Sequence, residues 1–169
     1  MNKRQKGFSL IELLIVVAII LIIAAIAIPN LLRARIAANE SSAVSNLRTL
    51  GTAEITYQAT YNGGFSPNLT SLCPPAAGSP AGTLKADLVD AVMCGSVTAA
   101  PTSGTATSFN KSGYGFTYAA AATNSGTFLV TSTPIAIGSS GQNAFCTDQT
   151  SVIHRNTTGA GCATADTPI

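Results

Sequence analysis

The residue whose type and position most clearly imply chemistry is Glu12, a carboxylic acid inside an apolar segment. From Phe8 to Ile28 the chain has 21 residues (28 − 8 + 1), and Glu12 is the single charged residue among them. Burying a carboxylate in such a segment is unfavourable unless it is paired, so an intramembrane carboxylate is a functional residue by default. We therefore take Glu12 as the first candidate site residue.

The ingredients of catalysis and of metal binding are sparse elsewhere. The chain has one histidine, His154, and no tryptophan, and no nucleophile–base pair or phosphate-binding loop is visible. The cysteines form no Cys-x-x-Cys pair, which argues against zinc. Calcium takes about six to eight oxygen ligands, and the C-terminal part offers only the carboxylates Asp148 and Asp166. We expect no metal, no cofactor and no enzymatic activity.

The overall charge excludes a further class of function. Charged residues make up 9% of the chain and the formal net charge is +2, with no cluster of lysine or arginine. Electrostatic binding of nucleic acid needs such a cluster on one face, so we expect no direct nucleic-acid binding.

The segment that holds Glu12 has the length of a membrane span. As a helix, 21 residues cover roughly 30 Å, the thickness of the hydrocarbon core of a bilayer. Lys3, Arg4 and Lys6 precede it, and the positive-inside rule then keeps the N-terminus in the cytoplasm. A signal peptide cut near Ala27 is the alternative, but the longer apolar run and Glu12 argue against it.

The residues from Lys6 to Leu13, Lys-Gly-Phe-Ser-Leu-Ile-Glu-Leu, resemble the cleavage and methylation signature of type IV pilins and type II secretion pseudopilins. The resemblance implies that residues 1–7 are a leader, which prepilin peptidase removes after Gly7 while it methylates the new N-terminal Phe8. The mature chain would have 162 residues (169 − 7) and a formal side-chain charge of −1 (6 − 7). Pro29 lies where members of this family usually carry a helix-loosening proline.

The same resemblance implies a structural role. It predicts a pilus subunit that polymerises with copies of itself through residues 8–29, with Glu12 pairing with the Phe8 amine of a neighbouring subunit. The implied partners are prepilin peptidase, an assembly platform in the inner membrane and a cytoplasmic ATPase. The precursor would span the inner membrane and the assembled protein would lie in an extracellular pilus. A major-type pseudopilin in a periplasmic pseudopilus is the alternative; a monomeric anchored binding module would have no use for Glu12.

Beyond the membrane segment, the helical pattern continues over residues 30–62. Alanine is frequent there, and Asn62-Gly63-Gly64 is a stop signal. The amphipathic half of the helix carries a one-sided apolar stripe, mostly spaced three, four or seven residues apart: Ile36, Val44, Leu47, Leu50, Tyr57 and Tyr61. Polar residues are expected to fill most of the other face: Arg35, Asn39, Glu40, Arg48, Thr49 and Glu54.

Residues 63–169 are predicted to form a loop followed by a globular sheet. Residues 65–113 are rich in small and polar residues and are expected to be mostly loop, with one short helix over residues 84–92. Alternating aromatic and apolar residues then predict about four antiparallel strands, near residues 114–118, 128–135, 145–147 and 152–154. The expected fold is α+β, with the sheet packed on the amphipathic half of the helix.

Four cysteines, Cys73, Cys94, Cys146 and Cys162, all follow the membrane segment, so we expect them in an oxidising compartment. Four cysteines allow three pairings, of which we favour Cys73–Cys94 and Cys146–Cys162. Each would close a loop of 21 (94 − 73) or 16 (162 − 146) residues and restrict the unfolded chain by about 3 kcal/mol.

Overall fold

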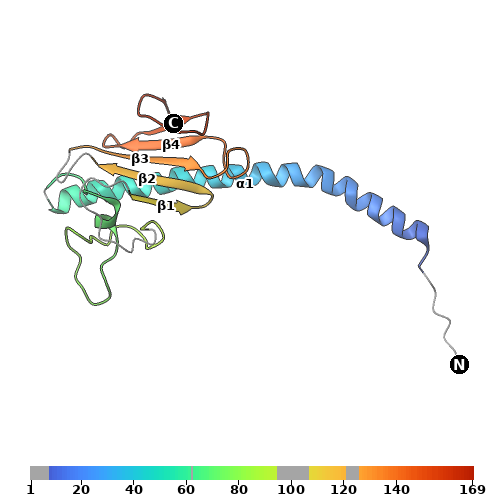
Figure 1. Cartoon of the computed structure of the whole chain (residues 1–169), viewed down its shortest axis with the longest axis horizontal. Coiled ribbons are helices and arrows are strands. Elements are labelled where there is room, and N and C mark those ends of the chain that lie inside the picture. The colour runs from blue at the N-terminus through green and yellow to red at the C-terminus, as the bar shows by residue number, and fades with distance from the viewer. Residues whose placement is uncertain (1–7, 62, 95–106, 121–125) are drawn as a thin grey trace. The chain divides into compact units, whose positions relative to one another are not determined.

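The computed structural model describes residues 8–61, 63–94, 107–120 and 126–169. Helix α1 spans Leu10–Tyr61. The chain divides into two compact units, Met1–Arg35 and Ile36–Ile169, so the division falls within α1. The first unit contains the apolar part of α1, and the second contains the rest of α1 with the sheet (Figure 1). The helix ends at Tyr61, where the sequence predicts its end.

Pro29 lies inside α1, and helical residues continue on both sides of it. Proline removes one hydrogen bond of the helix backbone and crowds the preceding turn, so a distortion at this residue has a physical cause. The kink at Pro29 and the division at residues 29 and 62 remain predictions.

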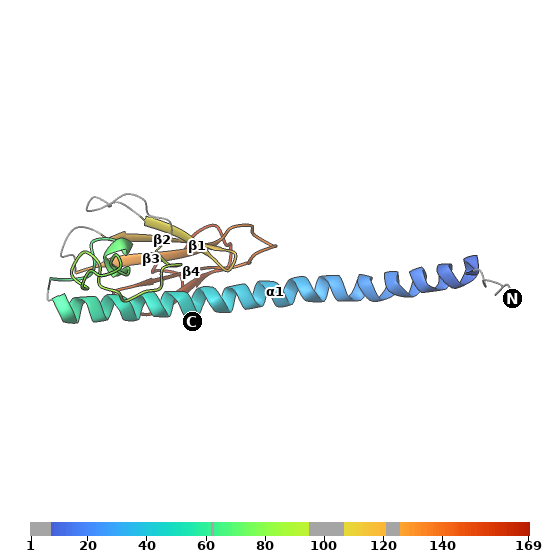
Figure 2. The same cartoon turned by 90° about the horizontal axis from the view of Figure 1, so that it is seen from below.

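In the described residues, six strands form one antiparallel sheet in the order β1-β2-β3-β4-β5-β6, which confirms the α+β fold but corrects the expected number of four. Every strand pairs with its neighbour in the sequence, as in a meander. Figure 2 shows the sheet lying along the C-terminal part of α1. The strands are β1 (Thr107–Lys111), β2 (Tyr114–Ala120), β3 (Phe128–Pro134), β4 (Ala144–Asp148), β5 (Ile153–Asn156) and β6 (Thr167–Pro168).

The two strands that the sequence pattern misses lie at the edges of the sheet. β1 has the sequence Thr-Ser-Phe-Asn-Lys, in which Phe109 is the one apolar residue, so no alternation marks it as a strand. It forms because its backbone pairs with β2 across the turn at Ser112 and Gly113, where both residues have positive φ. β6 has two residues and pairs with β5.

The helix expected over residues 84–92 is wrong. A 3-10 helix, η1, forms instead at Leu69–Leu72. Backbone N–H groups of the expected helix bond to that element: Ala86 donates to the carbonyl of Ser71, and Leu88 donates to the carbonyl of Leu72, both at 2.8 Å. These groups cannot also form a helix, and Asp87 has a φ of 56°. The apolar residues Ala86 and Val89 of this segment are buried in the core without forming a helix.

The core of the second unit lies between α1 and the inner face of the sheet. Leu47 and Leu50 of the predicted stripe are fully buried, as are Tyr114, Phe116 and Val130 of the sheet. Tyr57 is also buried and Val44 packs partly buried against the cluster. The side chains on the inner face of β2 and β3 alternate with more exposed ones, as expected for a sheet covered on one face.

Candidate assembly site on the N-terminal helix

Glu12 lies in the first turn of α1 and contacts the start of its own helix. The backbone N–H of Ser9 donates a hydrogen bond of 3.1 Å to Oε2 of Glu12. The carbonyl of Ser9 in turn accepts from the N–H of Leu13. This is one half of a capping box, in which a Ser-x-x-Glu sequence satisfies free N–H groups at a helix start. The sequence Ser9-Leu10-Ile11-Glu12 contains that signal, but the prediction of a pairing carboxylate overlooked it.

The apolar part of α1 is exposed on all sides. Side chains that follow one another along the helix, such as Leu13 at 60% and Leu14 at 61%, are exposed although they point in different directions. In the described part of the chain, α1 is the helix that is long and apolar enough to cross a membrane. No residue of its most apolar 18-residue stretch is buried in the structure. A helix that is hydrophobic all round is stable only where lipid or other protein covers it.

Three of the predicted site residues, Gly7, Phe8 and Glu12, lie in one short stretch of the sequence. Phe8 is 78% exposed and precedes Glu12 by four residues, about one turn of a helix. Gly7 lies outside the described residues. Within the described residues, the one hydrogen bond recorded for the Glu12 carboxylate is that from Ser9. The carboxylate thus lies near the N-terminal end of the apolar part of α1.

Arg35, Arg48 and Thr49 of the predicted polar face are exposed, but Asn39 and Glu40 contact another part of the globular unit. Asn39 donates from Nδ2 to the carbonyl of Ser140 at 2.7 Å. Oε1 of Glu40 accepts from the backbone N–H groups of Gln142 and Asn143 at 2.8 and 3.0 Å. These contacts attach α1 to the loop between β3 and β4, and charge alone in the sequence gives no sign of them.

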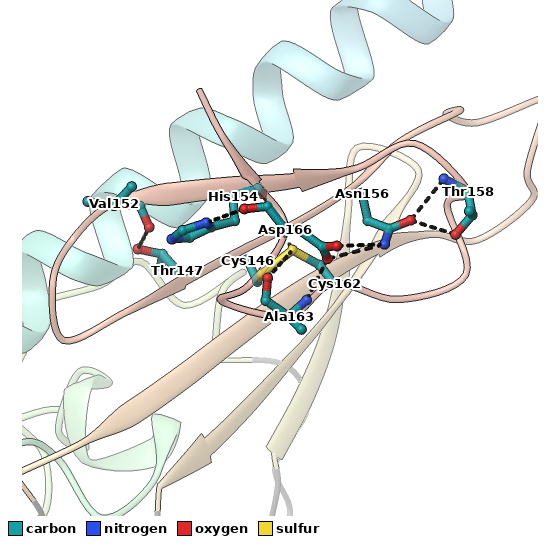
Figure 3. Close-up of a disulfide and its surroundings, with 9 residues drawn as sticks. All are labelled: Cys146, Thr147, Val152, His154, Asn156, Thr158, Cys162, Ala163 and Asp166. Carbon is teal, nitrogen blue, oxygen red and sulfur yellow. Dashed lines mark hydrogen bonds between the residues drawn. A yellow bond between two sulfur atoms is a disulfide. The ribbon is translucent and has the colours of Figure 1, made fainter.

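All four cysteines lie in the described residues, and they form the two favoured pairs, Cys73–Cys94 and Cys146–Cys162. Figure 3 shows the second disulfide, which joins β4 to the tail that follows β5. Around it, Nδ1 of His154 lies 2.9 Å from the carbonyl oxygen of Asp166, so the histidine helps to attach the tail to β5.

The two carboxylates considered for calcium are engaged in local hydrogen bonds. Asp166 accepts from the N–H of Ala163 and from Nδ2 of Asn156 (Figure 3). The N–H of Ala163 and the amide of Asn156 lower the pKa of Asp166, and the nearby His154 adds to this effect. Asp148 accepts from the backbone and the hydroxyl of Thr150. Within the described residues, no group of three or more histidine, cysteine, aspartate or glutamate residues is placed to hold a metal ion.

The N-terminal residues match a known protein family. Residues 2–28 match the family described as the prokaryotic N-terminal methylation motif. The chain is 55% identical over 53 residues to the type IV major pilin protein PilA of Myxococcus xanthus, a match that covers 31% of this chain and 24% of that protein. It is 44% identical over 70 residues to the type IV wide pilus major component PilA4 of Thermus thermophilus, over 41% of this chain and 53% of that protein. The matches thus span between about a quarter and half of these relatives. No solved structure matches the chain.

The chain thus combines an apolar helical segment that carries the methylation motif with an α+β globular unit. In its N-terminal part the chain resembles the two curated relatives and carries the methylation motif.

Proposed function

We propose that this chain is the structural subunit of a type IV pilus and polymerises through its N-terminal helix. The observation that carries the proposal is the apolar segment of α1, which is unburied and carries a single carboxylate within the methylation motif. Copies of this segment packed together would cover one another's apolar surface. The relatives named as pilin proteins favour a pilus over a secretion pseudopilus.

Before assembly, the same segment would anchor the precursor in the inner membrane with its N-terminus in the cytoplasm. There prepilin peptidase would cut after Gly7 and methylate Phe8. An assembly platform and a cytoplasmic ATPase would then drive the subunit into the filament. In that filament the Phe8 amine of one subunit would pair with Glu12 of a neighbour, because each charge needs a partner once lipid and water are excluded.

Intact-mass and N-terminal peptide analysis of filaments sheared from cells tests this proposal. We expect the chain in the filament to have 162 residues and to begin with N-methylated Phe8. Replacing Gly7 with a bulky residue should leave an uncut precursor in the membrane, because the peptidase must reach the backbone at that position. Filament protein that keeps residues 1–7, or that begins near Ala27, would contradict the proposal.

A further inference from the structure

Glu54 is a second carboxylate in an unexpected place. Its side chain has no exposed surface, and it points from α1 into the core between the helix and the sheet. Among the described residues, no cationic side chain pairs with it. The sequence pattern placed it on the polar face of the helix, so this burial corrects that prediction. A buried carboxylate without a cation is costly unless hydrogen bonds or a proton neutralise it.

Three hydroxyl and carboxyl groups form a closed cluster at this position. Oε2 of Glu54 accepts from the backbone N–H of Ser66 at 2.8 Å, and Oε1 lies 2.5 Å from Oγ of Ser66. The hydroxyl of Tyr118 lies 2.9 Å from the same Oγ and 2.8 Å from the carbonyl oxygen of Ser66. The carbonyl oxygen of Asn68 is a further acceptor, 3.1 Å from Oγ of Ser66.

Counting hydrogens shows which form of Glu54 fits this cluster. With an ionised Glu54, the single hydroxyl hydrogen of Ser66 bonds to Oε1, and the contact to Asn68 has no hydrogen. With a protonated Glu54, the acid donates to Oγ of Ser66, which donates to the carbonyl of Asn68. Tyr118 donates to the carbonyl of Ser66 in both forms. The protonated form therefore makes one more hydrogen bond, in a buried place where an unmade bond is expensive.

The surroundings of Glu54 favour the same form. The titratable groups that face it are Tyr118 on β2 and Tyr57 on α1, and burial raises the pKa of both. Burial raises the pKa of Glu54 above its ordinary value of about 4.5, and the hydrogen bonds from Ser66 oppose this only in part. A neutral acid avoids the cost of a buried, uncompensated charge.

We propose that Glu54 is a neutral carboxylic acid in the folded chain and that its proton completes a clamp joining α1 to the Ser66–Asn68 segment and to β2. The clamp is a pH-sensitive device. Ser66 and Asn68 lead directly into η1, and Asn68 caps that element through its side chain. Loss of the proton removes the hydrogen bond to Asn68 and places a charge in the core, so it loosens the attachment of this segment to α1.

Carbon-13 NMR of the full chain in detergent micelles, with the glutamate carboxyl carbons labelled, tests this directly. The chain has three glutamates, Glu12, Glu40 and Glu54. At about pH 6 an ordinary glutamate is ionised, so we expect the signal of Glu54 to keep the chemical shift of a neutral acid. The signal is assigned by its absence in Glu54→Gln. If that variant does not fold, Glu12→Gln and Glu40→Gln assign the other two signals and leave Glu54 by elimination. A Glu54 signal that titrates in the ordinary range would overturn the proposal.

The stability of the chain against pH gives a second test, with Glu40→Gln as the matched control. Because the folded chain holds a proton that the unfolded chain releases above about pH 4.5, Glu54 adds most to stability below that pH. As the pH rises towards the folded pKa, the folding constant of the wild type should fall by up to about tenfold per pH unit relative to Glu54→Gln. The Glu40→Gln variant should keep this fall. Equal pH dependence in the wild type and in Glu54→Gln would contradict the clamp.

Discussion

Glu12→Gln separates the charge of the N-terminal carboxyl group from its other roles. Among the residues that the structure describes, the N–H of Ser9 is the one hydrogen-bond donor to this carboxylate. The side-chain oxygen of glutamine can accept the same bond, so the helix start keeps its cap. The variant loses the interaction of a negative charge with the helix N-terminus, which is worth about 0.3–1 kcal/mol. We therefore expect the variant to be inserted, processed and stable.

The expected effect on assembly is much larger. Removing one partner of a buried ion pair costs about 3–5 kcal/mol, because the other charge stays buried and unpaired. At roughly 1.4 kcal/mol for each factor of ten, the affinity of a subunit for the growing filament should fall by about two to three and a half orders of magnitude. The experiment therefore compares a large loss of affinity for the filament with a small loss of stability in the single chain.

The assay compares filament yield with the membrane pools of precursor and mature protein. Glu12→Gln should show a normal mature pool and few or no filaments. Glu12→Ala serves as the control for the cap, since it removes both the charge and the acceptor for the N–H of Ser9. Normal filaments from Glu12→Gln would refute the reasoning and leave apolar packing as the whole driving force.

Two further predictions concern the globular unit. Replacing both Cys146 and Cys162 with alanine should lower the free energy of unfolding by about 3 kcal/mol in denaturant titrations, since the loop they close is no longer restrained; an unchanged midpoint would count against it. Gly141→Ala should destabilise the unit by about 1–3 kcal/mol, because its Cβ would overlap the hydroxyl and ring of the buried Tyr114. Gly126→Ala, where an added Cβ meets open space, is the control for thermal unfolding.

The sequence predicts best where a pattern is long and periodic. The end of α1 at Tyr61 and the burial of Leu47 and Leu50 follow from a stripe at helical spacing before a glycine pair. The strands β2 to β5 follow from alternating aromatic and apolar residues. In these places the local pattern and the tertiary packing favour the same structure, so the pattern alone is sufficient.

Prediction fails where long-range backbone pairing decides the structure. Residues 84–92 have a helical composition, but Ala86 and Leu88 use their N–H groups to bond to η1, which the sequence does not place beside them. β1 has one apolar residue and becomes a strand through its pairing with β2. Neither partner can be inferred from local propensity, because each pairing uses backbone groups of another segment of the chain.

Prediction also fails where a polar residue acts through its hydrogen bonds rather than its charge. Glu12, Glu40 and Glu54 all lie on α1, and their places in the structure differ. Glu12 caps the helix start, Glu40 attaches the helix to a loop, and Glu54 is enclosed in the core. The helical stripe already contains a hint about the third, since Glu54 lies four residues after Leu50 and three before Tyr57, on the buried face.

Glu12 and Glu54 lie on the same helix in different surroundings, and we propose different roles for their carboxyl groups. In the proposed filament, Glu12 would serve a contact between chains, because its carboxylate would attract the amine of a neighbour, and its side chain is exposed in the single chain. Glu54, by contrast, is enclosed within its own chain, where a charge would weaken the core, and a proton can neutralise it without any partner. One carboxylate can thus serve contacts between chains while the other stabilises a single chain, and changing one should leave the function of the other intact.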